Sequence, residues 1–361
     1  MACFRICRSP VLLVGIAILA GALMPGSAAQ SFVRVVSIAL DFGNARLAFS
    51  NDGRVLHAIG ASPDPSETQH VRAVTYDATT GAVLHSVNLE PDTTVQSTTS
   101  DGRTAIFAKG LGGPGEHIEL FLVDTETGKT EPIPSAWYDS KDTDASAELS
   151  GDGRLISIYS ESGTDDRPMA VSVYTWPGKT FVARQTSEYI SAGGGYGGGV
   201  TPDGHAIEFE NNRVGTRLVD LKTGREMAWF GRDSVRSPNG DWVVQLPDKT
   251  FEDESTAREV LIKDGASGKK LGKIDVPVPD DIAYGQMTGA FCGGAGRFIL
   301  ASGYGVAGYA IPSGALVASF PPDTWSDPAA LDHNYVSVAC SPTAGRVAIL
   351  SGTRLTLHAM K

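Results

Sequence analysis

The sequence has little helical signal and little positive charge. No convincing 3.6-residue apolar periodicity occurs after residue 29, so a helical fold is not expected. Lysine and arginine number 30 against 41 aspartates and glutamates, which gives a formal net charge of −11 at pH 7. Nucleic acids and anionic lipids bind to basic faces, so the shortage of positive charge argues against both as partners.

Motifs that mark catalytic and cofactor sites are also missing. The 7 histidines are scattered, and no His-x-x-x-His or His-Glu-x-x-His pair is present for zinc. The chain has no Gly-x-Ser-x-Gly nucleophile turn and no Cys-x-x-Cys-His sequence for haem attachment. We therefore expect no metal, no cofactor and no catalytic residues, which favours a binding protein over an enzyme.

Residues 1–29 have the form of a secretory signal peptide. Two arginines precede an apolar run from residue 10 to residue 24, and Ser27 and Ala29 fit a small-residue cleavage site. The run is shorter than the roughly 20 apolar residues that a membrane-spanning helix needs. Cleavage before Gln30 is therefore favoured over an uncleaved membrane anchor.

The mature chain, residues 30–361, is expected in the periplasm or outside the cell as a single domain. Cleavage removes two arginines and no acidic residue, which leaves 28 basic and 41 acidic residues and a charge of −13. No later stretch is apolar enough to cross a membrane. We expect a monomer whose partner is an envelope protein or an extracellular ligand.

A short glycine turn is repeated along the whole mature chain. It reads Ser-Pro-Asp-Gly-Arg with variations and occurs seven times, with its glycines at positions 53, 102, 153, 204, 240, 296 and 345. Glycine takes the positive-φ position of such a turn, and Asp or Asn presets it. A β-rich run such as Leu155–Tyr159 follows each turn, so the pattern predicts seven hairpins.

A second turn, of the Asp-x-x-Thr-Gly type, follows the first-turn glycine in six of the seven units, after 18 to 28 residues. Its clearest copies are Asp77–Gly81, Asp124–Gly128 and Asp220–Gly224. Two hairpin turns in each unit give four strands, and four-stranded units at this spacing are propeller blades. The sequence thus predicts an all-β, seven-bladed β-propeller with four-stranded antiparallel blades.

The seventh unit is too short to supply four strands. After Gly345 there is room for two strands, while a spare strand, Phe32–Ile38, precedes the first unit. Pairing the two ends would close the ring and remove two exposed sheet edges. We expect the N-terminal strand to become the outermost strand of the last blade.

These two turns resemble those of the WD-repeat-like propellers of bacterial envelopes. That superfamily includes TolB-like, YVTN-type and quinoprotein amine dehydrogenase beta-chain-like proteins. The resemblance runs from about Phe32 to the end of the chain and implies the propeller architecture, but it hardly specifies a function. The Gly-His and Trp-Asp signatures of eukaryotic WD repeats are missing, so eukaryotic partner rules do not transfer.

Ligands of propellers bind where the inter-blade loops meet at one mouth of the channel. Two such loops carry aromatic and polar side chains that form a candidate binding rim, namely Trp137, Tyr138, Asp139, Trp325, Asp327 and His333. Alternatively, the two tryptophans pack their loops onto the blades. The second functional hypothesis is a lactonase-like or esterase-like hydrolase, or a dehydrogenase subunit, and three or more channel carboxylates converging on one point would favour it.

Cys292 and Cys340 stand directly before the first turn in units six and seven. A disulfide between them would staple the last two blades if their Cα atoms lie within about 7 Å. Two small buried thiols are the alternative. The tract of six glycines around Tyr196, residues 193–199, is interpreted as a flexible or close-packed loop that enters the fourth inner strand.

Overall fold

The fold is taken from a computed structural model of the chain. It describes residues 30–61, 71–89, 93–110, 118–138, 146–160, 169–187, 196–211, 215–231, 233–247, 259–276, 287–292, 296–302, 305–320, 336–343 and 345–360. Within these segments, β-strands make up nearly all of the regular structure, and one short 3-10 turn, η1 (Ser135–Trp137), is the sole helical element. None of the described helical structure is long and apolar enough to cross a membrane.

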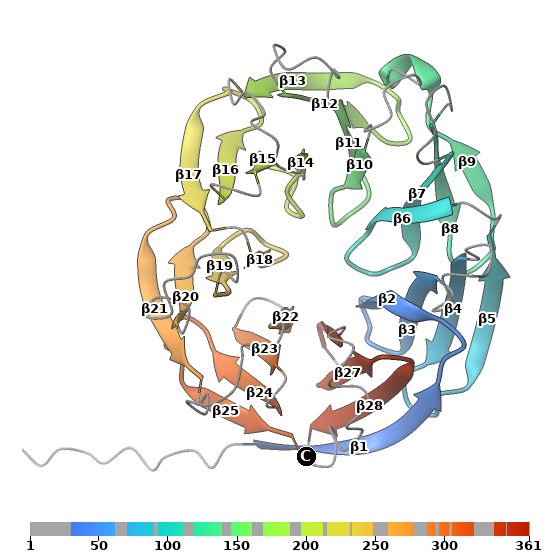
Figure 1. The fold of residues 1–361 in the computed structure, drawn as a ribbon, viewed down its shortest axis with the longest axis vertical. Coiled ribbons are helices and arrows are strands. Elements are labelled where there is room, and N and C mark those ends of the chain that lie inside the picture. The colour runs from blue at the N-terminus through green and yellow to red at the C-terminus, as the bar shows by residue number, and fades with distance from the viewer. Residues whose placement is uncertain are drawn as a thin grey trace, which may run out of the picture.

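The strands form seven four-stranded antiparallel blades around a central axis (Figure 1). Each blade runs from an inner strand beside the axis to an outer strand at the rim. Blades 1 to 3 consist of β2 (Gly43–Phe49), β3 (Val55–Ala61), β4 (Val71–Asp77) and β5 (Val83–Asn88); β6 (Thr93–Thr98), β7 (Thr104–Lys109), β8 (Glu119–Asp124) and β9 (Thr130–Pro132); and β10 (Ser146–Leu149), β11 (Leu155–Ser160), β12 (Met169–Thr175) and β13 (Phe181–Ser187).

The later blades repeat the same plan. Blades 4 to 6 consist of β14 (Tyr196–Val200), β15 (Ala206–Asn211), β16 (Gly215–Asp220) and β17 (Glu226–Phe230); β18 (Ser234–Arg236), β19 (Trp242–Gln245), β20 (Glu259–Asp264) and β21 (Lys270–Asp275); and β22 (Thr288–Cys292), β23 (Arg297–Ser302), β24 (Gly305–Ala310) and β25 (Leu316–Ser319). The predicted seven-bladed all-β fold is confirmed.

The two ends of the chain build the seventh blade together. It contains β26 (Val336–Cys340), β27 (Arg346–Ser351), β28 (Arg354–Met360) and, as its outermost strand, β1 (Gln30–Ala39). β1 runs antiparallel to β28, as the sequence predicted. The first two residues of β1 also pair in parallel with β25, so blades 6 and 7 become one eight-stranded sheet. Nothing in the sequence indicated this second pairing.

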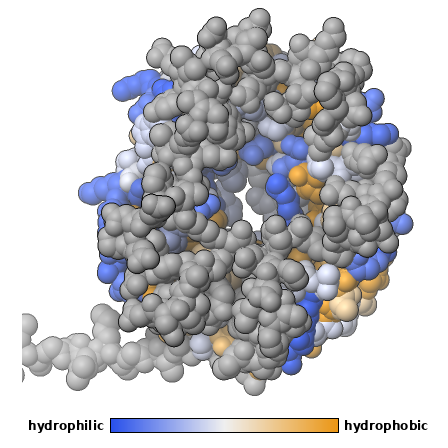
Figure 2. Space-filling model, viewed as in Figure 1, coloured by the Kyte–Doolittle hydropathy of each residue, from blue (hydrophilic) through white to orange (hydrophobic). Residues whose placement is uncertain are grey.

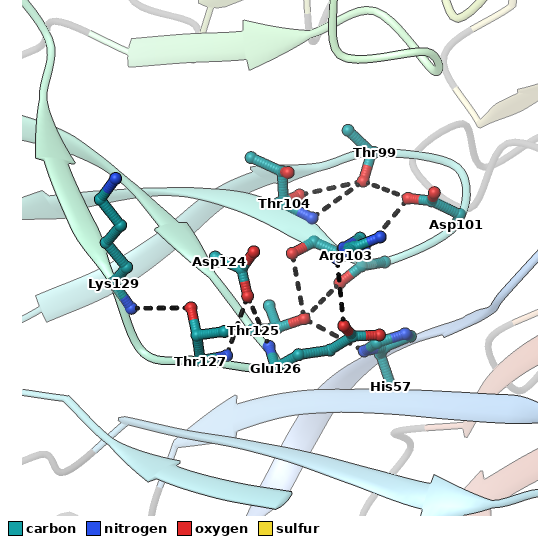
Figure 3. A network of polar contacts seen from close by, with 11 residues as sticks. His57, Thr99, Asp101, Arg103, Thr104, Asp124, Thr125, Glu126, Thr127 and Lys129 are labelled. Carbon is teal, nitrogen blue, oxygen red and sulfur yellow. Dashed lines mark hydrogen bonds and ion pairs between the residues drawn. The ribbon is translucent and has the colours of Figure 1, made fainter.

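Local hydrogen bonds shape the repeated turns, as blade 2 illustrates (Figure 3). Gly102 has a φ of 70°, and the Asp101 carboxylate accepts hydrogen bonds from the Thr99 hydroxyl and the Arg103 amide at 2.7 and 3.1 Å. In the second turn, Asp124 accepts from two backbone amides at 3.0 and 2.8 Å. These hydrogen bonds join residues at most three positions apart, so each turn forms from its own neighbours in sequence.

A buried histidine links blades 1 and 2 (Figure 3). His57 on β3 places Nδ1 3.1 Å from Thr125 Oγ1, and that hydroxyl lies 2.9 Å from the Gly102 carbonyl oxygen. The same hydroxyl also lies 3.1 Å from the Arg103 carbonyl oxygen, and its single proton goes either to a carbonyl oxygen or to Nδ1, so the tautomer of His57 sets the direction of the bond. Burial lowers the pKa of His57, so the imidazole is a neutral structural contact.

The hydrophobic core is divided among the interfaces between blades. Seven buried apolar clusters occupy the seven interfaces around the ring, one between each pair of neighbouring blades. Each blade therefore buries both of its faces against its neighbours. This arrangement leaves the inner edges of the blades and the loops at the two faces of the ring as the places where polar side chains gather.

A disulfide joins the inner strands of blades 6 and 7. Cys292 ends β22 and Cys340 ends β26, and their Cα atoms lie 4.9 Å apart, well within the bridging limit. The structure thus decides between the two alternatives that the sequence left open. The interface between blades 6 and 7 is held at its inner end by the disulfide and at its outer end by β1.

Candidate functional site

The predicted binding rim is described only in part, and its described residues pack onto the blades. Trp137 stacks on Tyr174 of β12 with ring centroids 4.0 Å apart. The Tyr138 hydroxyl accepts a hydrogen bond from the Leu120 amide at 3.2 Å. Both are half-buried against the apolar cluster between blades 2 and 3, which for Trp137 is what the packing alternative predicts. The other rim residues, Asp139, Trp325, Asp327 and His333, lie outside the described residues.

The glycine tract proves to be part of an inner strand. Residues 196–200 form β14, so the interpretation of these residues as a loop was wrong, while residues 193–195 lie outside the described part. A Cβ atom on Gly199 would collide with the Glu148 carboxylate, and one on Gly197 would lie 3.3 Å from Oε2 of Glu210. Glycines at 197 and 199 therefore allow these carboxylates to lie close against β14.

Five charged side chains gather around this strand, and we call them the channel cluster: Arg46, Glu148, Glu208, Glu210 and Arg236. Arg46 and Glu148 are exposed on the inner strands of blades 1 and 3, and both glutamates of β15 face the glycine strand. Figure 2 shows a central opening with hydrophilic residues on its visible wall.

Arg236 holds one carboxylate of the channel cluster in place. Its Nε lies 2.7 Å from Oε1 of Glu208, and its Nη1 donates to the Gly265 carbonyl oxygen at 2.9 Å. The Arg236 side chain is only 6% exposed, which makes this a nearly buried ion pair between blades 4 and 5. Glu208 is therefore fixed by the fold.

The other two carboxylates of the cluster, Glu148 and Glu210, carry negative charges that neighbouring groups make unfavourable. Desolvation by the surrounding protein and, to a smaller extent, repulsion from Glu208 and Glu210 raise the pKa of Glu148 to about 7. The positive charge of Arg46 opposes this shift. Desolvation is also the largest cause that raises the pKa of Glu210, and the negative charges of Glu208 and Asp233 raise it further. The Glu148 side chain still meets water in the channel. Near neutral pH it is thus divided between acid and carboxylate.

The turn carboxylates behave in the opposite way. Hydrogen bonds from the backbone amides of Thr80 and Thr79 lower the pKa of Asp77, and the one from Thr80 has the larger effect. The hydroxyl and then the amide of Thr223 lower the pKa of Asp220. The scaffold thus stabilises its structural carboxylates as anions, whereas the channel cluster holds carboxylates whose charge is unfavourable.

The cluster can accept a cation, or it can exchange a proton near neutral pH. Glu148, Glu208 and Glu210 lie near one another beside β14. Among the described residues, however, no group of three or more His, Cys, Asp or Glu side chains is placed to hold a metal ion, so these three do not form the single converging site that would favour the hydrolase.

The pKa of Glu148 predicts a pH-dependent stability. A folded-state pKa of about 7, above the ordinary 4.5, means that the stabilising contribution is present below about pH 4.5 and is lost as the pH rises through about 7. Replacing Glu148 by Gln should therefore raise the free energy of unfolding at about pH 8 relative to wild type, and much less at about pH 5. Urea unfolding at both pH values measures this difference. Glu119→Gln, at an exposed position of β8, is the control, and parallel behaviour of the two variants would contradict the prediction.

Sequence reasoning missed Glu148 and Arg46. Both are charged residues between apolar neighbours on inner strands, as in Ala147-Glu148-Leu149. On a strand, alternate side chains point to opposite faces, so this pattern places the charge away from the core. A charged residue on an inner strand was the signal that could have found them.

Comparison with models of known protein families gives no match, and comparison with curated proteins also gives none. Of what the resemblance to envelope propellers implies, the structure shows the seven-bladed architecture. The class that the structure defines is the seven-bladed β-propeller.

Proposed function

We propose that this chain is an exported, non-enzymatic β-propeller that binds a ligand or protein partner through its channel cluster. The proposal rests on the contrast between the turn carboxylates, whose pKa is lowered, and the channel carboxylates, whose pKa is raised. Glu148 and Glu210 bear charges that enclosure and mutual repulsion make unfavourable. A cationic group placed between them would relieve that repulsion, and this relief would contribute favourably to the free energy of binding.

The rest of the molecule suits a scaffold. Seven separate core clusters hold the blades, and the turn side chains are engaged in their own hydrogen bonds. The channel cluster is therefore presented on a rigid support, which lowers the entropy cost of binding. Export is proposed from residues 1–29, whose pattern is that of a signal peptide.

Titration of the mature chain with spermidine and with trilysine tests the proposal. We expect binding at low salt, and we expect the dissociation constant to rise by roughly tenfold or more when Glu148 and Glu210 are both replaced by Gln. Binding of a cation should also release protons near pH 7, which makes the measured enthalpy depend on the buffer.

The matched control replaces two glutamates outside the channel, Glu119 and Glu131, by Gln. Equal loss of binding in the control would assign the effect to general surface charge. If neither probe binds, or if the channel variant binds as tightly as wild type, the channel cluster is not the binding site.

A hydrolase remains the second candidate because Glu148 titrates near neutral pH, where a general acid or base works best. In that case the mature chain should turn over a lactone or an ester from a small substrate panel. Replacing Glu148 by Gln should then lower kcat by roughly a hundredfold or more with little change in KM. Absence of turnover across the panel would favour the binding scaffold.

A further inference from the structure

A second concave site lies at the interface between blades 6 and 7, and none of its residues belongs to the channel cluster. It is a pocket of about 380 Å³, lined by the two cysteines and by Phe32, Arg297, Thr343 and Met360, among others. This volume falls within the range of small-ligand sites.

The disulfide is part of the pocket wall. Cys292 and Cys340 both line the pocket, and both keep some exposure to solvent. A small molecule inside the pocket can therefore reach the bridge without any opening of the blades. Access of this kind is one of the conditions that set the rate of thiol–disulfide exchange.

A cation stands beside the bridge in the same wall. Arg297 follows the degenerate first turn of blade 6, and its Nη1 lies 2.9 Å from the Met360 sulfur. Of the described residues that line the pocket, Arg297 is cationic and none is acidic. A guanidinium group attracts carboxylates and stabilises a neighbouring thiolate.

We propose that this pocket is a thiol–disulfide exchange site for small thiols that carry carboxylates. The carboxylate of the thiol would pair with Arg297 while its thiolate attacks one sulfur of the Cys292–Cys340 bridge. A new S–S bond forms between the small thiol and that cysteine, the old S–S bond breaks, and the other cysteine leaves as a thiolate that takes a proton from water. A second thiol then releases the first as an external disulfide, which leaves two cysteine thiols.

Blades 6 and 7 are also held together by strand pairing and apolar packing, so the disulfide can exchange while the protein stays folded. β1 pairs with both β25 and β28, and an apolar cluster containing Phe32 fills the same interface. Breaking the disulfide removes only the inner connection between blades 6 and 7. Exchange therefore does not require the ring to open.

The test compares an anionic thiol, glutathione, with a neutral thiol, 2-mercaptoethanol, at equal thiolate concentrations. The rate of loss of the Cys292–Cys340 bridge is followed by alkylation and mass spectrometry. In wild type we expect the ratio of the glutathione rate to the 2-mercaptoethanol rate to exceed that of Arg297→Met by about fivefold at low salt. The excess should shrink at high salt, because the attraction is electrostatic.

Two further variants make the comparison specific. Arg154→Met changes the arginine at the same turn position of blade 3, where the side chain is exposed, and should keep the wild-type ratio. Arg297→Lys keeps the charge and should retain most of the ratio. An equal ratio in wild type and Arg297→Met would overturn the proposal, as would bridge loss at a rate independent of thiol concentration, which would mean that reduction follows global unfolding.

Discussion

Deletion of β1, residues 30–39, is expected to leave a chain that does not form a stable ring. The deletion exposes the edges of β28 and β25 and empties the place of Phe32, which is 2% exposed and stacks on Phe320 with ring centroids 4.3 Å apart. Loss of a buried Phe side chain alone costs about 3–5 kcal/mol, a large part of the 5–15 kcal/mol that stabilises a typical domain. Far-UV circular dichroism, size-exclusion chromatography and urea unfolding of the 40–361 chain measure the effect.

A synthetic peptide of residues 30–39 provides the specific control. Added to the truncated chain during refolding, it should restore part of the native circular dichroism signal, because its pairing with β28 needs no covalent link. The Val35→Ser variant of the full mature chain, at a position that is 49% exposed, should unfold close to wild type. A truncated chain with the wild-type urea midpoint would show that β1 is not needed for closure.

Replacement of Gly102 by Ala is expected to cost about 2–5 kcal/mol of the free energy of unfolding. Gly102 has a φ of 70°, which costs an L-residue about 1–2 kcal/mol. In addition, its new Cβ would lie 2.8 Å from the Cβ atoms of both Ala48 and His57. These atoms belong to neighbouring strands of blade 1 and cannot move away easily, so the overlap adds about 1–3 kcal/mol.

Gly352→Ala is the matched control for this substitution. Gly352 has a similar φ of 59°, but nothing lies within 4 Å of a Cβ placed there. Its replacement should therefore cost only the backbone contribution of about 1–2 kcal/mol. Urea unfolding of both variants separates the two effects, and equal losses would contradict the packing argument.

The fold could be predicted because its signals are local. In most turns, as at Gly102 and Gly128, an aspartate accepts hydrogen bonds from residues two or three positions away, and the glycine takes a positive φ. The second turn of blade 3 differs, because Lys179 takes the positive φ there. The number of turns set the number of blades, and the shortage of strands after Gly345 predicted the role of β1. No long-range information was needed for any of these inferences.

The candidate site could not be predicted in the same way. Arg46, Glu148 and Glu210 lie on three different blades, and the packing of the blades around the axis brings their charges together. The aromatic residues chosen from the sequence gave a weaker guide, since Trp137 and Tyr138 are engaged in packing. Aromatic side chains suit a core contact and a binding surface equally well, so composition alone could not separate the two.

The sequence by itself determined the seven blades, their four strands and the sharing of the last blade between the two ends of the chain. These follow from repeated turns whose hydrogen bonds and backbone angles are set by neighbours in sequence. The tertiary structure decided that residues 196–200 form a strand, that the two cysteines are bridged and that three carboxylates lie near one another beside β14. Those facts depend on distances between blades, and only the closed ring sets these distances.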